Sequence, residues 1–539
     1  MTDQIESACR QTTQQPGNTL SNHLPPESDH SLHQLRIKLS STDALPQLTA
    51  IGMLIGLLAG GLLILFREIV TGSTSFWLPR GDEHFETLSE LSRFIIPVIG
   101  SLAIFCLFAC TPVKRRSVGI LHVVERLQFH KGKMSFSGMM LQFFGAIIAL
   151  ISGFSVGREG PAVHVGATTG SLLGQKLRLP QNTLSILAAC GAAAAISASF
   201  NTPMAGVIFA MEVVLRQYTL NSFIPVIAAA VMAAVLSQIM YGPDPAFMVP
   251  VIPMASLPEL GIAAVSACLI GVLAAGFIKL QLWTASKRQK LLINPLFLAG
   301  ICMGAVGYFL PAVMGIGYDT IELILNGELM SVSFLLTLLA AKLVTTALVT
   351  GLGIPGGIIG PSLMMGALSG AAFGHLGDLM LRLPDVSSAF HALLGMVAMM
   401  AAVLQAPMAA LVTVLELTRN PHIIMPAMFV IVIACLVAGR LTAQGGLIEM
   451  QLNAKGYDNR HSLLNQLLSQ KGIATIMSRN FDLLNDTDIV PVPVHASLQD
   501  ALEIMESHSV EVLGVYTSGR RHQVLCGVIT RQAIDSFYR

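Results

Sequence analysis

Gly157-Arg158-Glu159-Gly160-Pro161 opens an apolar, helix-like stretch, and Gly357-Ile358-Ile359-Gly360-Pro361 opens another two hundred residues later. Six glycine or proline positions coincide without a gap: Gly157/Gly357, Gly160/Gly360, Pro161/Pro361, Gly166/Gly366, Gly170/Gly370 and Gly174/Gly374. Such agreement within 18 positions is improbable by chance, so the pattern predicts a duplicated membrane unit. In duplicated membrane proteins of this kind, the helix starts of the two copies meet near one polar site. We therefore expect the functional site there.

The composition predicts a membrane protein with many helices. Hydrophobic residues make up 53% of the 539 residues, charged residues only 12%, and the mean hydropathy is +0.67. A soluble chain carries roughly twice that share of charge. Four apolar runs are long enough to cross a hydrocarbon core of ~30 Å: Leu48–Phe66, Phe94–Cys110, Leu260–Phe277 and Ile423–Gly439. Further runs lie near 135–154, 183–211, 222–241, 294–315, 332–350 and 386–414, so we expect an all-α polytopic fold.

A second repeated block supports the duplication. The sequence of Phe200–Gly206 runs on to Glu212, and its counterpart Leu404–Ala410 runs on to Glu416. The offset between these blocks is 204 residues, so the second copy has gained about four residues. Glu212 and Glu416 end matched helices, where they either cap a helix or meet an interface. The spacing leaves parallel and inverted topologies open.

The N-terminal segment, the basic residues, the net charge and the cysteines give further expectations about topology and partners. Residues 1–45 are polar and are expected to form a disordered tail. Basic residues beside the first span, Arg36 and Lys38, place both termini in the cytoplasm under the positive-inside rule. The net charge of +1 predicts no nucleic-acid partner. The eight cysteines are scattered, and we expect no metal site.

The composition changes after about residue 455. We expect a linker over 456–472 and a small α/β module over 473–539. Strand-like segments occupy 489–494, 510–516 and 524–530, and an amphipathic helix is expected over 497–506.

Glu159 is the leading candidate for a functional side chain. A carboxylate inside a membrane costs at least ~2.5–3.5 kcal/mol on insertion scales, so it marks a functional site by default. The alternative is an ion pair with Arg158 at the membrane surface, but adjacent helical residues do not face each other. His164, one turn later, is expected to be a packing residue.

The glycines around Glu159 suit helix starts with bare backbone N–H groups. Such groups, with the positive end of the helix dipole, bind an anion without a fixed positive charge. Weak binding of this kind allows an ion to leave again. Two helix starts that meet could therefore hold one small anion.

These motifs resemble one known family. Gly157–His164 is similar to the GREGP-x-VH signature of the CLC chloride channels and proton/chloride exchangers, and Gly351–Pro361 is similar to their second filter segment. The resemblance covers roughly residues 46–455, and the soluble tail resembles a single CBS module.

The resemblance implies a homodimer in a bacterial inner membrane, with inverted repeats over about 46–245 and 257–455 and many tilted, broken helices. One chloride pathway crosses each protomer among membrane lipids. Glu159 would be the gating residue, whose carboxylate competes with the anion. The ion would be held mostly by backbone amides of six residues: Gly157, Arg158, Gly160, Ile358, Ile359 and Gly360.

The sequence departs from the family at two filter hydroxyls. The first filter segment aligns with Ser117, Val118, Gly119 and Ile120, which puts Val118 in the place of a serine unless Ser117 shifts. Ile448 stands at the position of the family's tyrosine. Losing both hydroxyls would leave the central site drier and weaker for anions, and would remove an inner constriction.

A third departure concerns the mechanism. Val213 occupies the position of the internal proton-transfer glutamate. Valine cannot relay a proton, so we expect a passive chloride channel rather than an enzyme. The alternative is a proton/chloride antiporter with another internal proton route. Less favoured hypotheses are a non-conducting scaffold and an intramembrane hydrolase that uses His164 with Ser155.

The CBS-like tail also departs from its family. Ala533 stands where a ribose-binding aspartate is expected, and Asp535 comes two residues too late. We therefore expect no cofactor, and a nucleotide in this module is doubtful. A stabilising role in the dimer is the alternative.

Overall fold

The computed structural model describes most of the chain outside its first 44 residues. The described ranges are 45–78, 84–112, 115–244, 247, 259–328, 331–381, 387–443, 445–457, 468, 472–473, 476–478, 490–493, 496–517 and 524–536. The expected N-terminal tail, with Arg36 and Lys38, lies outside these residues, as does most of the expected linker.

Helices of the first half follow one another with short connections. They are α3 (Leu45–Thr74), α4 (Glu90–Ala109), α5 (Gly119–Phe129), α6 (Phe136–Ile151), α7 (Glu159–Lys176), α8 (Gln181–Phe200), α9 (Pro203–Phe209) and α10 (Leu220–Tyr241). A 3₁₀ turn, η1 (Phe85–Thr87), precedes α4, and a π-helical segment, η3 (Ala210–Leu215), continues α9.

The second half repeats this series. It contains α11 (Glu259–Lys287), α12 (Pro295–Phe309), α13 (Tyr318–Leu325), α14 (Val332–Leu352), α15 (Ile359–Leu381), α16 (Ser388–Leu404), α17 (Pro407–Thr418), α18 (Ile424–Thr442) and α19 (Leu447–Ala454). Three 3₁₀ turns connect them: η4 (Arg288–Lys290), η5 (Pro311–Val313) and η6 (Pro421–Ile423).

The packing of the two halves is equivalent. Helix α7 packs on α8 as α15 packs on α16, and α10 packs on α3 as α18 packs on α11. Helices α9 and α17 contact each other between the halves. The structure therefore places the two sequence copies in matching environments, as the repeated glycines predict.

Glycine makes the closest of these helix contacts possible. A Cβ at Gly166 on α7 would overlap the carbonyl oxygen of Gly191 on α8, and a Cβ at Gly366 on α15 would overlap that of Gly395 on α16. Small residues let helix backbones approach closely in membrane proteins. The repeated glycines therefore serve packing as well as the site.

The long apolar runs near 183–211 and 386–414 are each broken at the same place. Asn201 caps the C-terminus of α8 and Gln405 caps that of α16, both in the left-handed region with φ of 58° and 52°. The next helix then begins with a proline, Pro203 in α9 and Pro407 in α17. Proline suits a first helical position because its missing N–H would be unpaired there.

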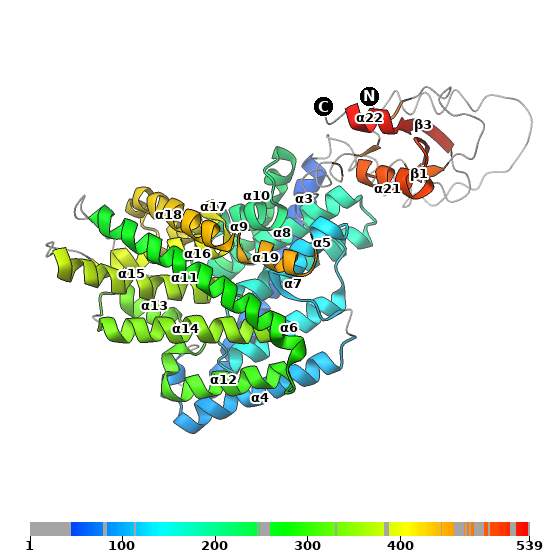
Figure 1. The fold of residues 1–539 in the computed structure, drawn as a ribbon. Helices are drawn as coiled ribbons and strands as arrows, with labels where there is room; N and C mark the ends of the chain where they lie inside the picture. The colour runs from blue at the N-terminus through cyan, green and yellow to red at the C-terminus, as the bar shows by residue number, and fades with distance from the viewer. Residues whose placement is uncertain are drawn as a thin grey trace, which may run out of the picture.

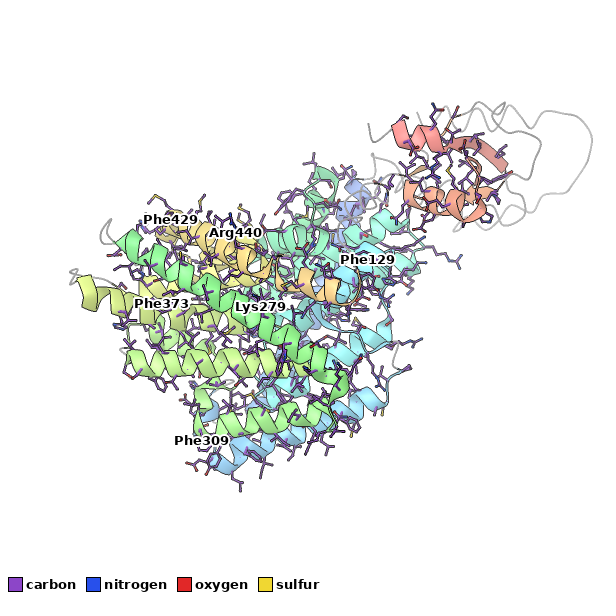
Figure 2. The ribbon with its side chains drawn as sticks, in the orientation of Figure 1. Phe129, Lys279, Phe309, Phe373, Phe429 and Arg440 are labelled. Carbon is purple, nitrogen blue, oxygen red and sulfur yellow. The ribbon has the colours of Figure 1, made fainter. Side chains whose placement is uncertain are left out.

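The described helices suit a lipid environment. Seven of those within the described ranges are long and apolar enough to cross a membrane. Apolar side chains point outward from the bundle, such as Phe309 on α12 and Phe429 on α18, which are 78% and 41% exposed (Figure 2). An apolar outer surface of this kind is stable in lipid and not in water. The chain is a multi-pass membrane protein.

The C-terminal module forms a unit of its own at one side of the helix bundle (Figure 1), and its Asp500 pairs with Lys131 of the bundle. It contains β1 (Pro491–Pro493), α21 (Leu498–His508), β2 (Val512–Thr517), β3 (Val524–Thr530) and α22 (Arg531–Ser536). Strand β1 pairs parallel with β2, and β2 pairs antiparallel with β3. Ser497 and Asp500 form a capping box that starts α21. The segments agree with the strand and helix pattern expected from the sequence.

Candidate anion site

The starts of α7 and α15 are joined backbone to backbone. The N–H of Gly157 donates to the carbonyl of Gly357 at 2.7 Å, and the N–H of Gly357 donates to the carbonyl of Gly157 at 2.6 Å. The bridge is antiparallel. The two copies therefore meet head to head, in the geometry of inverted repeats.

The meeting point has no room for side chains. A Cβ at Gly357 would lie 2.6 Å from the backbone nitrogen of Gly160, and a Cβ at Gly160 would lie 2.8 Å from the Cα of Gly357. Real Cβ atoms do not approach other atoms this closely. Glycine at these positions is what lets two helix starts share one small volume.

The carboxylate of Glu159 occupies this volume. The side chain is fully buried, and it would collide with a Cβ placed on Gly157. A Cβ on Gly357 or Gly360 would lie 3.0 or 3.1 Å from its oxygens. The backbone of Gly360, at the start of α15, therefore lies next to the carboxylate. The Glu159 carboxylate thus lies at the helix N-termini, where a bound anion would be expected.

Tyr318 holds the carboxylate there, and sequence reasoning missed it. Its hydroxyl donates to Oε1 of Glu159 at 2.9 Å. Oε2 has no hydrogen-bond partner of good geometry among the described residues. Tyr318 is the first residue of α13, and the repeated spacing of the sequence does not mark it.

A buried lysine fixes the loop that presents Tyr318. The Nζ of Lys342, which is fully buried, donates to the carbonyls of Val313 and Gly315 at 2.9 and 2.8 Å. The Arg158 guanidinium lies over the rings of Phe200 and Tyr318 at 5.2 and 5.4 Å. Cation–π contact stabilises this half-buried guanidinium beside the gate. The described residues show no ion pair between Arg158 and Glu159.

The first filter segment forms the start of α5. Val118 is the N-cap residue and caps with no side-chain hydrogen bond, and Gly119 has a φ of +85°. Ser117 and Val118 are half-buried, and Ile120 is buried. Helix α5 packs against α7 and η3, so this segment belongs to the same wall as the gate helix.

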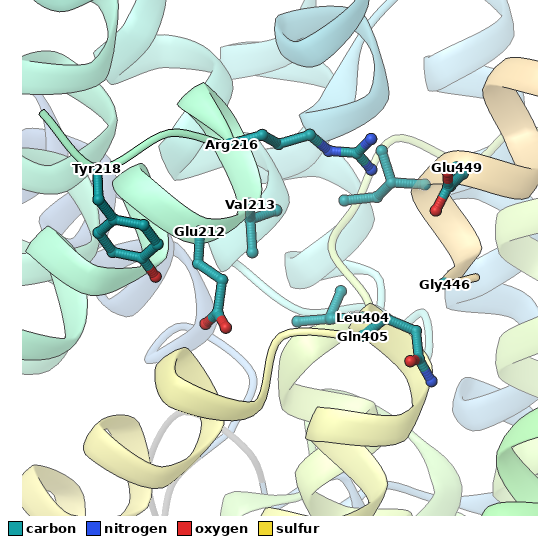
Figure 3. Close-up of a pocket in the computed structure, with 9 residues that line it drawn as sticks. Glu212, Val213, Arg216, Tyr218, Leu404, Gln405, Gly446 and Glu449 are labelled. Atoms are coloured by element: carbon teal, nitrogen blue, oxygen red, sulfur yellow. The ribbon is translucent and has the colours of Figure 1, made fainter. Parts of the chain in front are cut away.

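The two remaining altered positions share one pocket. Val213, from η3, and Ile448, from α19, both line a cavity of about 270 Å³ (Figure 3). We call it the inner pocket. Its lining is Glu212, Val213, Arg216, Tyr218, Leu404, Gln405, Gly446, Ile448 and Glu449. The expected positions of the internal glutamate and of the tyrosine are therefore neighbours in space, from the two halves of the chain.

Glu212 and Glu416 are reciprocal helix caps. Glu212 accepts from the N–H groups of Met408 and Ala409 at 3.2 and 2.6 Å, which start α17. Glu416 accepts from those of Met204 and Ala205 at 3.1 and 2.7 Å, which start α9. Both carboxylates satisfy helix N-termini of the other half. The structure thus decides between the two roles that the sequence left open.

His164 and Ser155 have separate partners. The Nε2 of His164 lies 2.9 Å from the Nδ1 of His122, and Ser155 Oγ lies 2.8 Å from Thr346 Oγ1. The structure does not bring them together as a base and a nucleophile. The hydrolase hypothesis therefore loses its basis.

The described ranges contain no group of three or more metal-ligating side chains. In the module, α22 begins after Thr530, whose hydroxyl accepts from the N–H of Ala533 at 3.2 Å. Asp535 is exposed on this helix. The geometry adds nothing in favour of a nucleotide at Ala533.

The fold and site define a class: membrane proteins of two inverted repeats whose helix starts converge on a buried carboxylate. The family of the chain follows from its sequence. The model of the family described as voltage gated chloride channel matches residues 99–439, and the chain belongs to that family.

Proteins of similar sequence include transporters and a putative channel. A putative chloride channel protein, ClcB-like, from Ralstonia nicotianae is 28% identical over 408 residues, which are 73% of this chain and 93% of the relative. An H(+)/Cl(-) exchange transporter, ClcA, from Vibrio cholerae is 29% identical over 408 residues, which are 73% of this chain and 86% of the relative. The ClcA of Vibrio parahaemolyticus is 33% identical over 315 residues, 56% of this chain and 67% of the relative.

Solved structures share the fold. A slow cyanobacterial Cl−/H+ antiporter is similar with a TM-score of 0.65 and 20% identity, over 77% of this chain and 99% of the other. A eukaryotic CLC transporter is similar with a TM-score of 0.62 and 17% identity, over 93% of this chain and 98% of the other. At these identities the likeness concerns the fold alone.

Proposed function

We propose that this protein exchanges chloride for protons across the membrane, with Glu159 as the group that both fluxes use. The observation that carries the proposal is the Glu159 carboxylate lying over the joined starts of α7 and α15. An ionised carboxylate and a chloride ion compete for the same amides. Protonation of Glu159 removes this competition, so proton binding and anion binding become linked.

The proposal replaces the passive channel expected from Val213. The ClcA relatives described above are named as exchangers, which favours the alternative that the sequence left open. Val213 still lies in the inner pocket and still cannot carry a proton. The proton must therefore enter by another group, as the alternative requires.

The gate has the parts that an exchange cycle needs. In the closed form, Tyr318 donates a hydrogen bond to the carboxylate, which lies beside the backbone of Gly360. A proton that arrives on Oε2 neutralises the side chain and frees the amides for chloride. When the side chain returns, it displaces the anion and releases its proton. Each visit of the acid to the site thus moves the two ions in opposite directions.

Reconstitution tests the proposal. Purified protein is reconstituted in liposomes with an outward chloride gradient, and the membrane potential is clamped with a potassium ionophore. We expect the liposomes to take up protons against the proton gradient. A Glu159→Gln variant should lose this uptake. Chloride efflux with no proton uptake in the unmodified protein would contradict exchange and support the channel hypothesis instead. The homodimer stays a prediction.

A further inference from the structure

The inner pocket contains four titratable or charged side chains, and only some of them can receive a proton. Glu212 and Glu449 are acids, Arg216 is a base, and Tyr218 is a phenol (Figure 3). Arginine stays charged in proteins, and a phenol keeps its proton up to a pH of about 10. Proton uptake near neutral pH in this pocket therefore requires one of the two glutamates.

Glu212 caps a helix of the other half of the chain. Its two carboxylate oxygens accept from two N–H groups at the start of α17. Glu416 makes the same pair of bonds with the start of α9, which shows that the contact belongs to the duplicated framework. Protonating Glu212 would break a cap that joins the two halves. Glu449 is the other acid that lines the pocket.

Glu449 stands in the right place. It follows Ile448 directly in the first turn of α19 and is half-buried in the wall that also contains Val213. Its carboxylate folds back over Gly445, whose φ of +98° and missing Cβ leave the space for it. The first turn of a helix stabilises a carboxylate without preventing its protonation.

Arg216 completes the arrangement. It leaves the end of η3 in the left-handed region, with a φ of 57°, and its guanidinium is in electrostatic contact with Glu449. Figure 3 shows the two side chains reaching into the pocket from different segments. A fixed positive charge beside the carboxylate attracts chloride when Glu449 is neutral, and it is balanced when Glu449 is ionised.

We propose that Glu449 is the internal proton-binding residue of this exchanger, in place of the acid that Val213 does not supply. The inference rests on the proposed function. The Glu449 carboxylate takes a proton from water on the side of the inner pocket and releases it to water in the pathway. The Oε2 of Glu159, which lacks a hydrogen-bond partner among the described residues, then accepts a proton from that water. No other bond changes, and both carboxylates return to their ionised form at the end of the cycle.

The test uses the full-length protein in liposomes, with chloride and proton fluxes recorded together. We expect Glu449→Gln to reduce proton movement at least tenfold while chloride still moves, and Glu449→Asp to retain coupled movement. The matched control is Glu68→Gln, because Glu68 is an exposed-surface acid that accepts from Tyr241 at 2.7 Å, far in sequence from the pocket.

Three outcomes distinguish failure of the role proposed for Glu449 from failure of the proposed exchange. Coupled fluxes in Glu449→Gln equal to those of the unmodified protein would overturn the role of Glu449 and leave exchange intact. Loss of both fluxes in Glu449→Gln and in Glu449→Asp would also overturn it, because Glu449 would then serve the fold or the anion. Chloride flux without proton flux in the unmodified protein would overturn exchange itself.

Discussion

Gly157 and Gly357 hydrogen-bond to each other twice, at 2.7 and 2.6 Å, although they lie two hundred residues apart in the sequence. This bridge fixes the starts of α7 and α15 against each other and creates the volume that Glu159 fills. The candidate anion site of this chain is therefore formed by both copies of the repeat. Neither half could form it alone.

Replacing Gly357 with alanine tests the bridge. The new Cβ would lie 2.6 Å from the backbone nitrogen of Gly160, and overpacking of this kind costs about 1–3 kcal/mol. We expect a lower thermal unfolding temperature in detergent and loss of anion flux. The control is Gly276→Ala in α11, where a Cβ meets nothing within 4 Å. Equal stability of both variants would contradict the tight bridge.

Replacing Tyr318 with phenylalanine tests the closed gate. The change removes the 2.9 Å hydrogen bond to Glu159, and a hydrogen bond to a charged group is worth about 1.5–3 kcal/mol. The closed form loses that much stability, so we expect chloride turnover at neutral pH to rise about tenfold or more. Tyr308→Phe, on the surface of α12, should change nothing. Unchanged turnover in Tyr318→Phe would mean that the hydroxyl does not hold the gate.

How far the sequence predicts this structure depends on which residues carry the information. Gly157, Glu159 and Gly357 are visible in the sequence because the duplication repeats their spacing and because a charge in an apolar stretch is conspicuous. The expected membrane spans, the broken helices and the strand pattern of the module follow in the same way from local composition and periodicity. Those features depend on neighbours in the chain.

Contacts between distant segments could not be predicted. The partner of Glu159 is Tyr318, 159 positions away, and nothing in the spacing selects one tyrosine among the seven. The sequence likewise treats Val213 and Ile448 as separate departures, whereas the structure puts them in one pocket with Glu449. Because of this proximity, Glu449 is a candidate to replace the acid that is missing at Val213.

His122 ties the filter helix to the gate helix. On α5, its Nε2 accepts from Nε of Arg126 at 3.1 Å, and its Nδ1 lies 2.9 Å from Nε2 of His164 on α7. Since arginine can only donate, a neutral His122 must carry its proton on Nδ1 and donate to His164. This order fixes the tautomers of both rings.

The His122→Ala variant tests that connection. It leaves a buried imidazole and a guanidinium without their partner, which costs about 1–3 kcal/mol. We expect a lower unfolding temperature than for His422→Ala, which removes an exposed ring. No difference between the two variants would show that the histidine pair adds no stability.

We predict that the contact between the module and the membrane domain depends on pH through Asp500. It forms an ion pair with Lys131, just after α5. Burial alone would raise the pKa of Asp500, but hydrogen bonds from Lys131 and Ser497 outweigh burial and hold the pKa below its usual value. The carboxylate therefore stabilises the contact at every pH above the unfolded value of about 3.9, and this contribution disappears as the pH falls through the lower folded pKa.

Hydrogen exchange of the 130–133 loop measures this effect. We expect protection at pH 7 that decreases as the pH falls below about 4. In Asp500→Asn we expect weaker protection at pH 7 and no such decrease. The exposed acid Glu503 is the control, as Glu503→Gln. Protection that is the same in Asp500→Asn and in the unmodified protein would mean that the ion pair does not hold the module.

The reversal potential of the current through reconstituted protein tests the central claim most directly. With equal chloride on both sides and a tenfold difference in proton concentration, an exchanger has a reversal potential away from zero, because each chloride that crosses the membrane is coupled to proton movement in the opposite direction. We predict such a shift for the unmodified protein and its loss in Glu159→Gln. A reversal at zero in the unmodified protein would show that chloride moves alone, and would contradict exchange through Glu159.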